Sequence, residues 1–142
     1  MLSRRPLLFR FAKMESRRRQ LLVRAAFALT AASFAVAALP FRHAMKFGPI
    51  PLGRRKDLDP AECVWAIEAA SYRLPWRTMC IEKGLATQRL LRASGVDAAL
   101  HYGARNNPDD RTLEAHVWVT VGGTTVIGDE SPLQFTELAT YR

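Results

Sequence analysis

Cysteine and histidine are both scarce in this chain, and their scarcity limits the chemistry open to it. Only two cysteines, Cys63 and Cys80, occur among 142 residues, which is too few for the framework of a disulfide-stabilised secreted protein. A single Cys63–Cys80 disulfide stays an alternative, but a reducing, cytosolic compartment fits this cysteine usage better. Of the three histidines, His101 and His116 lie near acidic residues, yet their spacing is not that of a zinc site. The sequence therefore predicts chemistry that needs no metal and no cofactor.

The chain also lacks an apolar run of the length that usually spans a membrane. The uninterrupted apolar part, from Ala25 to Leu39, covers only 15 residues, whereas a spanning helix needs roughly 20. A basic start followed by an apolar segment is also typical of signal peptides and membrane anchors. We favour a helix that packs on the domain or lies on a membrane surface and that ends at Pro40. Residues 1–42 are therefore a candidate contact with a membrane surface.

The net charge of +8 hides opposite balances in two parts of the chain. Residues 1–56 contain 13 Lys or Arg and one acidic residue, whereas residues 57–142 contain 8 basic and 12 acidic residues. We therefore expect a basic N-terminal extension over residues 1–56, with an Ala-rich apolar helix and a Gly- and Pro-rich linker, and a second domain over residues 57–142. A nucleic-acid partner is not expected, because the aromatic residues are not interleaved with basic ones along a face.

Two helices are predicted in the second part. The first begins at Asp59-Pro60-Ala61-Glu62, which combines an N-cap, an N1 proline and an acidic third residue, and it runs to about Tyr72. The second covers Ile81 to Ser94, with Thr78 as the expected N-cap. Cys80 then lies in the first turn, where unpaired N–H groups and the positive helix end favour a thiolate and can bind an oxyanion. The alternative is that Cys80 is a small buried apolar residue.

A strand and a β-hairpin are predicted after these helices. Residues 97–104 alternate weakly, and His101 within them is expected to be an exposed or satisfied strand histidine rather than a catalytic one. Two further β-patterned runs flank Gly122-Gly123, a sequence typical of a two-residue hairpin turn. If the paired residue numbers always sum to 245, His116 lies directly opposite Asp129, with Cβ atoms about 4.5–5.5 Å apart. A carboxylate there would orient the imidazole, whereas a bulge would move Asp129 off this face.

The order of these elements predicts an α+β fold. A helix and a second helix with Cys80 are followed by a strand, a loop, a strand with His116, a turn and a strand with Asp129. This arrangement would bring a nucleophile, a base and an orienting carboxylate together. Val117 is expected to face the core, and Trp118 shares the face of His116, where it would cover the His–Asp pair or fill the core.

Several segments of the second part together resemble one known family. These segments are Arg73-Leu-Pro-Trp-Arg-Thr-Met-Cys80, Gly84-Leu-Ala-Thr-Gln-Arg-Leu-Leu91, Gly95-Val96, Tyr102-Gly103 and Ala115-His-Val-Trp-Val119. They are similar to the leader peptidases of lasso-peptide biosynthesis, which are transglutaminase-like, papain-related cysteine proteases. The likeness covers about residues 59–130. It is specific as a joint pattern, although each segment alone is weak.

The resemblance implies a fold and a set of site residues. The fold is papain/transglutaminase-like, with the nucleophile at a helix N-terminus packed on a small antiparallel sheet and with an N-terminal helical extension. The family's cysteine, histidine and aspartate fall on Cys80, His116 and Asp129. The sequence departs from the family just after the nucleophile, where Ile81 replaces the usual Leu and the helix start is less basic. Glu82, unless it is paired, would oppose formation of a thiolate.

The resemblance also implies a function and partners. The family cleaves the leader from a ribosomally made precursor peptide, after which an ATP-dependent partner cyclase closes a macrolactam ring. Only about 58 residues precede the catalytic part, so the chain resembles the stand-alone protease form, which relies on a separate leader-binding protein. Two alternatives stay open. One is a non-catalytic adaptor that delivers the precursor to the cyclase through the basic N-terminal third, and the other is a transglutaminase-like acyltransferase with an amine acceptor.

Overall fold

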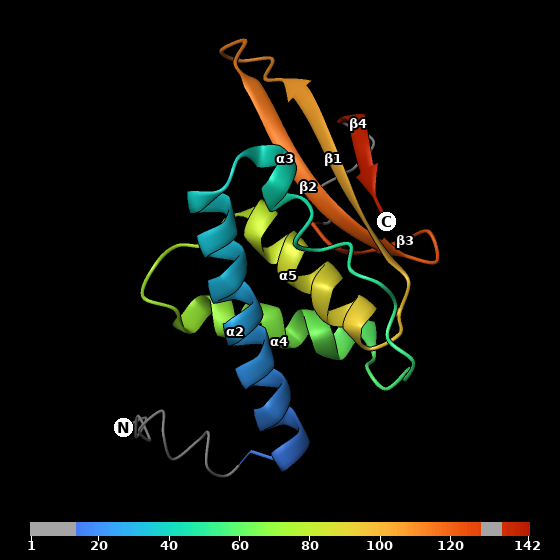
Figure 1. The fold of residues 1–142 in the computed structure, drawn as a ribbon. Coiled ribbons are helices and arrows are strands. Elements are labelled where there is room, and N and C mark those ends of the chain that lie inside the picture. Colours follow the sequence, from blue (N-terminus) through green and yellow to red (C-terminus); the bar gives the residue numbers. More distant parts are fainter. Residues whose placement is uncertain (1–13, 129–134) are drawn as a thin grey trace.

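The computed structural model describes residues 14–128 and 135–142. The helices in these residues are α2 (Ser16–Ala38), α3 (Phe41–Ala44), α4 (Pro60–Arg73) and α5 (Cys80–Ala93). The strands are β1 (Ala98–Asn106), β2 (Leu113–Val121), β3 (Thr124–Ile127) and β4 (Thr136–Tyr141). These strands form an antiparallel sheet in the order β3-β2-β1-β4 (Figure 1).

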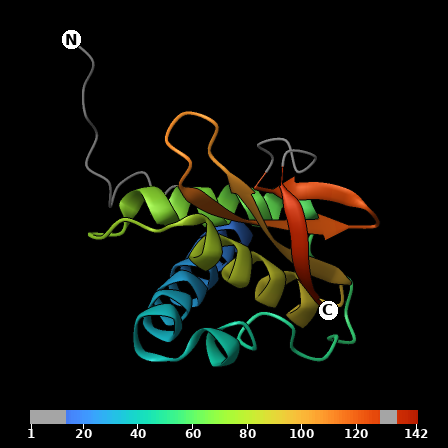
Figure 2. The ribbon, with the colours of Figure 1, turned by 90° about the horizontal axis from the view of Figure 1, so that it is seen from above.

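Helix α5 lies at the centre of the fold, in contact with α2, α4 and the two middle strands, β1 and β2 (Figures 1 and 2). Its apolar side chains suit this position, since Leu85 and Leu91 are fully buried. They share one core with Ile67 of α4, Leu100 of β1 and Val119 of β2. The expected α+β class, with Cys80 at the start of a helix packed on a small antiparallel sheet, is confirmed.

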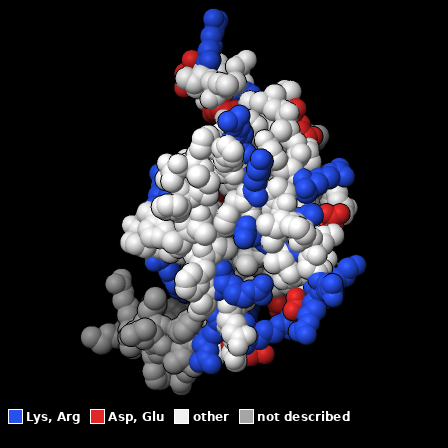
Figure 3. All heavy atoms as spheres, viewed as in Figure 1, with Lys and Arg blue, Asp and Glu red and all other residues white. Residues whose placement is uncertain are grey.

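Helix α2 contributes one of its faces to the same core. Ala25, Leu29 and Ala32 have no exposed surface, and the small alanines allow close contact with α4 and α5. By length and composition α2 could also cross a membrane, but part of its apolar surface is buried within the fold. Its other face lies at the surface, where few charged side chains are seen along the helix (Figure 3).

The segment between α3 and α4 was predicted as a linker. Hydrogen bonds between its backbone groups and α5 hold it along that helix. Gly53 N–H donates to the Arg92 carbonyl oxygen at 2.7 Å, and Arg92 Nε donates to the Ile50 carbonyl oxygen at 2.6 Å. Arg89 reaches the Phe47 carbonyl oxygen at 2.7 Å in the same way. The arginines on this side of α5 therefore satisfy carbonyl groups of an irregular segment that would otherwise lack partners.

The predicted hairpin turn is confirmed at Gly122-Gly123. Both glycines have positive φ, 57° and 80°, which is the backbone conformation that a two-residue turn between twisted strands requires. Strands β2 and β3 begin to pair directly beside the turn, at Val121 and Thr124. The local turn chemistry thus fixed the position of the hairpin.

A β-bulge then breaks the constant register. Val119 pairs with Ile127, whereas a sum of 245 would place Val126 opposite it. The extra residue in β3 shifts everything beyond it by one position. The register that placed His116 opposite Asp129 is therefore wrong. Strand β3 ends at Ile127, and Asp129 lies outside the described residues.

Strand β4, in a segment that the sequence left unassigned, completes the sheet. It pairs antiparallel to β1 on the edge opposite β3, with an irregularity between Tyr102 and Gly103. The pairing of Gly103 with Glu137 and of Ala104 with Thr136 sets the start of β4. This start carries Phe135 toward the face of the sheet that holds His116.

A substitution in α2 tests whether its buried face is part of the folded core. Leu29→Ala is expected to lower the free energy of unfolding by about 2–5 kcal/mol, because it removes a fully buried side chain and leaves a cavity. Phe27→Ala on the exposed face is the matched control and should cost less than about 1 kcal/mol. Urea unfolding followed by circular dichroism measures both. Equal, small effects would show that α2 does not pack on the domain.

Candidate active site

Cys80 is the first residue of α5. Met79 is the N-cap, so the prediction that Thr78 caps this helix is wrong, and the Thr78 hydroxyl instead hydrogen-bonds the Ser71 hydroxyl of α4. Cys80 is half-buried and lies where first-turn N–H groups lack intrahelical acceptors and the helix dipole is positive. The Glu82 carboxylate accepts a hydrogen bond from the Met79 N–H at the helix start. This bond engages the one acidic side chain of the first turn.

His116 lies on β2 and is oriented by a backbone carbonyl. Its Nε2 is 2.9 Å from the Gly128 carbonyl oxygen, just past the end of β3. A carbonyl only accepts, so Nε2 must carry the proton, and in the neutral ring Nδ1 is left as the acceptor. Gly128 has φ +84°, and an added Cβ would come within 2.6 Å of the Val117 carbonyl oxygen. Only glycine fits there, and no pattern in the sequence had marked Gly128 as part of the site.

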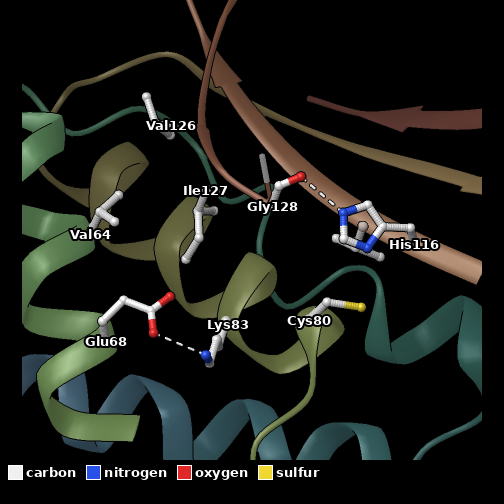
Figure 4. Close-up of a pocket in the computed structure, with 9 residues that line it drawn as sticks. Val64, Glu68, Cys80, Lys83, His116, Val126, Ile127 and Gly128 are labelled. Atoms are coloured by element: carbon white, nitrogen blue, oxygen red, sulfur yellow. Dashed lines mark hydrogen bonds and ion pairs between the residues drawn. The ribbon is translucent and has the colours of Figure 1, made fainter. Parts of the chain in front are cut away.

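Cys80 and His116 lie on one cavity of about 580 Å3. Figure 4 shows the Cys80 sulfur on the same side as the His116 ring, whose second nitrogen faces away from the Gly128 carbonyl. The remaining wall is mixed in character. Apolar side chains of Val64 and Ile127 line it, together with an ion pair of 3.0 Å between Lys83 Nζ and a Glu68 carboxylate oxygen. The cavity can therefore hold a peptide group beside the thiol with an apolar side chain next to it.

The structure brings together two of the three predicted site residues. Cys80 and His116 share the cavity, and each comes from the element type that the sequence predicted, a helix start and a hairpin strand. Asp129 directly follows Gly128 in the chain and lies outside the described residues. Among residues 14–128 and 135–142, no cluster of three His, Cys, Asp or Glu side chains could hold a metal ion.

Two aromatic rings stack near His116. The Phe135 ring lies 5.0 Å from it at 27°, and the Trp118 ring lies 6.2 Å from it at 20°. Trp118 is only 6% exposed and covers Gly103 of the neighbouring strand, where an added Cβ would come within 2.9 Å of its ring. Ring stacking of this kind restricts how the imidazole can tilt. Trp118 therefore packs beside His116 and fills the outer face of the sheet.

His101 is the next ring in this stack and has a structural environment. It lies parallel to Trp118, with ring centroids 5.4 Å apart. Its Nδ1 pairs with a Glu137 carboxylate oxygen at 2.5 Å, and its Nε2 lies 2.8 Å from the Thr120 hydroxyl. Hydrogen bonds from the Thr140 hydroxyl and from His101 hold the pKa of Glu137 below its usual range. Both ring nitrogens have partners, which confirms the expectation of a satisfied strand histidine.

The second cysteine, Cys63, has a different environment. It lies inside the core on α4 with no exposed surface, and both cysteines are free thiols. Burial raises the pKa of the Cys63 thiol to about 12, although the positive charge of Arg24 acts in the opposite direction. A thiol that is buried and protonated at neutral pH is a poor nucleophile. Of the two cysteines, only Cys80 is accessible from the surface.

One comparison with known proteins identifies a family. A family model described as "Transglutaminase-like superfamily" matches residues 15–140. The matched region includes α2 as well as the elements that carry Cys80 and His116. No curated protein and no solved structure gives a significant match.

Thiol labelling of the native protein separates the two cysteines. Iodoacetamide at neutral pH should label Cys80 alone, because Cys63 is buried and its pKa is about 12. Cys80→Ala should abolish labelling until the protein is unfolded, and Cys63→Ala should leave it unchanged. Mass spectrometry of the digested protein locates the adduct. Labelling of Cys63 in the native protein would contradict the assignment of Cys80 as the accessible thiol.

Substitution of Gly128 tests the role of its carbonyl group. Gly128→Ala should displace this carbonyl, because the new Cβ would collide with Val117 and Trp118. We expect labelling of Cys80 to slow by roughly ten- to a hundredfold, the range expected when a catalytic base is misplaced. Gly122→Ala is the matched control, since Gly122 also has positive φ but nothing lies within 4 Å of an added Cβ.

Both glycine variants carry the backbone strain of a side chain at positive φ, so thermal unfolding of each measures that shared cost. A rate loss at Gly128 alone isolates the effect of crowding beside His116. Equal labelling rates in the two variants would show that the Gly128 carbonyl does not position the imidazole.

Proposed function

The chain belongs to the transglutaminase-like superfamily, and we propose that it is a cysteine protease that removes the leader from a ribosomally made lasso-peptide precursor. The superfamily carries acyl-transfer chemistry of the cysteine-peptidase and acyltransferase type. The observation that supports the proposal is a thiol at a helix start and an imidazole with a fixed tautomer on one cavity. Cleavage would precede macrolactam closure by an ATP-dependent partner cyclase.

In the proposed mechanism the proton moves between Cys80 and the Nδ1 of His116. Nδ1 accepts the thiol proton as the sulfur attacks the scissile carbonyl carbon, and first-turn N–H groups of α5 stabilise the oxyanion. The imidazolium then donates its proton to the leaving amine, which releases the peptide on the C-terminal side and leaves a thioester. Water attacks the thioester with Nδ1 as the base, and the carboxylate product and the free thiol are formed.

Asp129 is the proposed third member of the triad. Nε2 of His116 donates to the Gly128 carbonyl, which sets the tautomer but brings no full negative charge. A carboxylate nearby would stabilise the imidazolium that forms during acylation. Asp129 follows Gly128 immediately in the sequence, and this position supports the assignment.

The segments Arg73–Cys80 and Ala115–Val119 support a precursor peptide as the substrate, because they contain the two site residues and resemble the leader peptidases. The proposal includes two protein partners: a separate small protein that binds the leader, and the cyclase that receives the freed core peptide. The cavity wall adds a chemical preference, since Val64 and Ile127 favour an apolar side chain beside the scissile bond.

The superfamily also supports a second function, acyl transfer to an amine. The same thioester would form, and an amine in place of water would release it. A non-catalytic adaptor is the third alternative, in which the basic N-terminal third delivers the precursor to the cyclase. The adaptor requires no reactive thiol, whereas both enzymatic functions do.

An assay with a precursor peptide and its leader-binding protein distinguishes these functions. We expect separate leader and core fragments by mass spectrometry. Cys80→Ala should lower the rate at least about a thousandfold, because loss of the nucleophile removes the covalent pathway. Cys63→Ala is the matched control and should keep the native rate within about twofold, since Cys63 is buried in the core and does not line the cavity.

The products decide between the alternatives. A leader fragment with a free carboxylate supports hydrolysis, whereas a leader fragment joined to an added amine supports acyl transfer. Release of the core peptide by Cys80→Ala at the native rate would reject both enzymatic functions and leave the adaptor.

A further inference from the structure

One face of α2 exposes large apolar side chains that no described part of the chain covers. Val23 is 41% exposed, Phe27 74% and Phe34 72%. Their spacings of four and seven residues place them on one side of the helix. The opposite side, which includes Leu22 and Leu29, is buried against α4 and α5. α2 therefore has a core face and a second apolar face at the surface.

The second apolar face carries no charge over most of its length. From Ala25 to Phe41 the sequence contains no Lys, Arg, Asp or Glu. Thr30 lies between the two exposed phenylalanines, and its hydroxyl is satisfied by donation to the Ala26 carbonyl oxygen at 2.8 Å. The exposed side of Thr30 is thus mainly its methyl group. A continuous apolar surface of this kind usually marks a contact site with another molecule or a membrane.

Positive charge borders this face at both ends. Figure 3 shows Lys and Arg gathered near the N-terminal end of α2, with an uncharged surface along the helix. Glu15 is the only acidic residue from Met14 to Lys46, and the basic residues of this stretch are Arg17, Arg18, Arg19, Arg24, Arg42 and Lys46. A hollow of about 450 Å3 beside Val23 is lined by Arg19, Gln20 and Arg24. Its lining is mainly apolar, so it continues the apolar face toward the N-terminal arginines.

We propose that the exposed face of α2 docks on an anionic membrane surface, with the helix lying in the plane of the interface. An apolar face bordered by arginines is the pattern of interfacial helices, whose apolar side enters the headgroup region while the cations meet anionic lipids. A second copy of the chain fits this face less well, because the arginines of one copy would then lie near the arginines of the other and repel them. The inference goes beyond the proposed peptide cleavage and does not depend on it.

The buried face of α2 determines how the helix would lie relative to the membrane. A spanning helix would expose all its sides to lipid, so Leu22, Ala25 and Leu29 would leave the core they share with α4 and α5. Docking on the surface leaves this core intact. Trp76, in the loop before Cys80, donates to the Ser33 hydroxyl of α2 at 3.0 Å. The docked helix would therefore hold the Cys80 cavity at a fixed position relative to the membrane.

Co-sedimentation of the full chain with lipid vesicles tests the proposal. We expect binding to vesicles that contain phosphatidylglycerol, little binding to vesicles of phosphatidylcholine alone, and weaker binding as salt is raised. The double variant Phe27→Ser/Phe34→Ser should lower the affinity at least about tenfold, because it removes the two largest apolar contacts. Circular dichroism and Cys80 labelling confirm that it stays folded.

The matched control is Leu113→Ser/Leu138→Ser, which removes two exposed leucines from the sheet and should bind as the native chain does. Four results would overturn the proposal. The first is that the phenylalanine variant binds vesicles as tightly as the native chain, and the second is that the native chain does not bind anionic vesicles. The third is that the bound chain resists extraction with alkaline carbonate. The fourth is that the variant loses a dimer but keeps its binding to lipid. The third result would indicate a spanning helix and the fourth an interface between two copies.

Discussion

The hydrogen bond from His116 Nε2 to the Gly128 carbonyl organises the chemistry of this fold. Because a carbonyl can only accept, the bond places the proton on one ring nitrogen and leaves the other as an acceptor in the neutral ring. It depends on the bulge in β3, which ends regular pairing at Ile127 and lets the chain turn at a glycine of positive φ. The tautomer is therefore a property of the hairpin backbone. A carboxylate near His116 would add negative charge, but the backbone carbonyl has already set the orientation of the ring.

Cys80 and His116 line the same cavity because α5 packs closely against β2. A Cβ on Gly84 would lie 2.7 Å from the Val117 side chain, so the first turns of the helix can approach the strand only without one. Contacts with α2 and α4 fix the other sides of α5. Cys80, at the first position of that helix, is thus placed by packing of the whole core rather than by its own loop. This explains why a family match that includes α2 is physically reasonable.

The parts of this site that follow from local chemistry could be predicted from the sequence. The helices containing Pro60 and Cys80 have proline, glycine and apolar spacing as signals, and the Gly122-Gly123 turn has a short-range signature. The predicted register of β2 and β3 holds for the two residue pairs next to the turn and is wrong beyond them. The bulge that shifts it places Ile127 in the core, where it is 8% exposed, so its cause is burial and not a signal from adjacent residues. The stacking of Phe135 on His116 requires β4 to pair with β1, and no sequence pattern predicted this pairing.

The two faces of α2 also could not be told apart from the sequence. Both faces are apolar, so periodicity along the helix could not say which one belongs to the core; only the contacts with α4 and α5 decide it. A helix that is apolar all round is expected to be buried all round. Here phenylalanines remain exposed while alanines and leucines are buried, although burying phenylalanine would release more apolar area from water. Small residues on the core side permit close packing of three helices, and this constraint leaves the largest rings exposed at the surface.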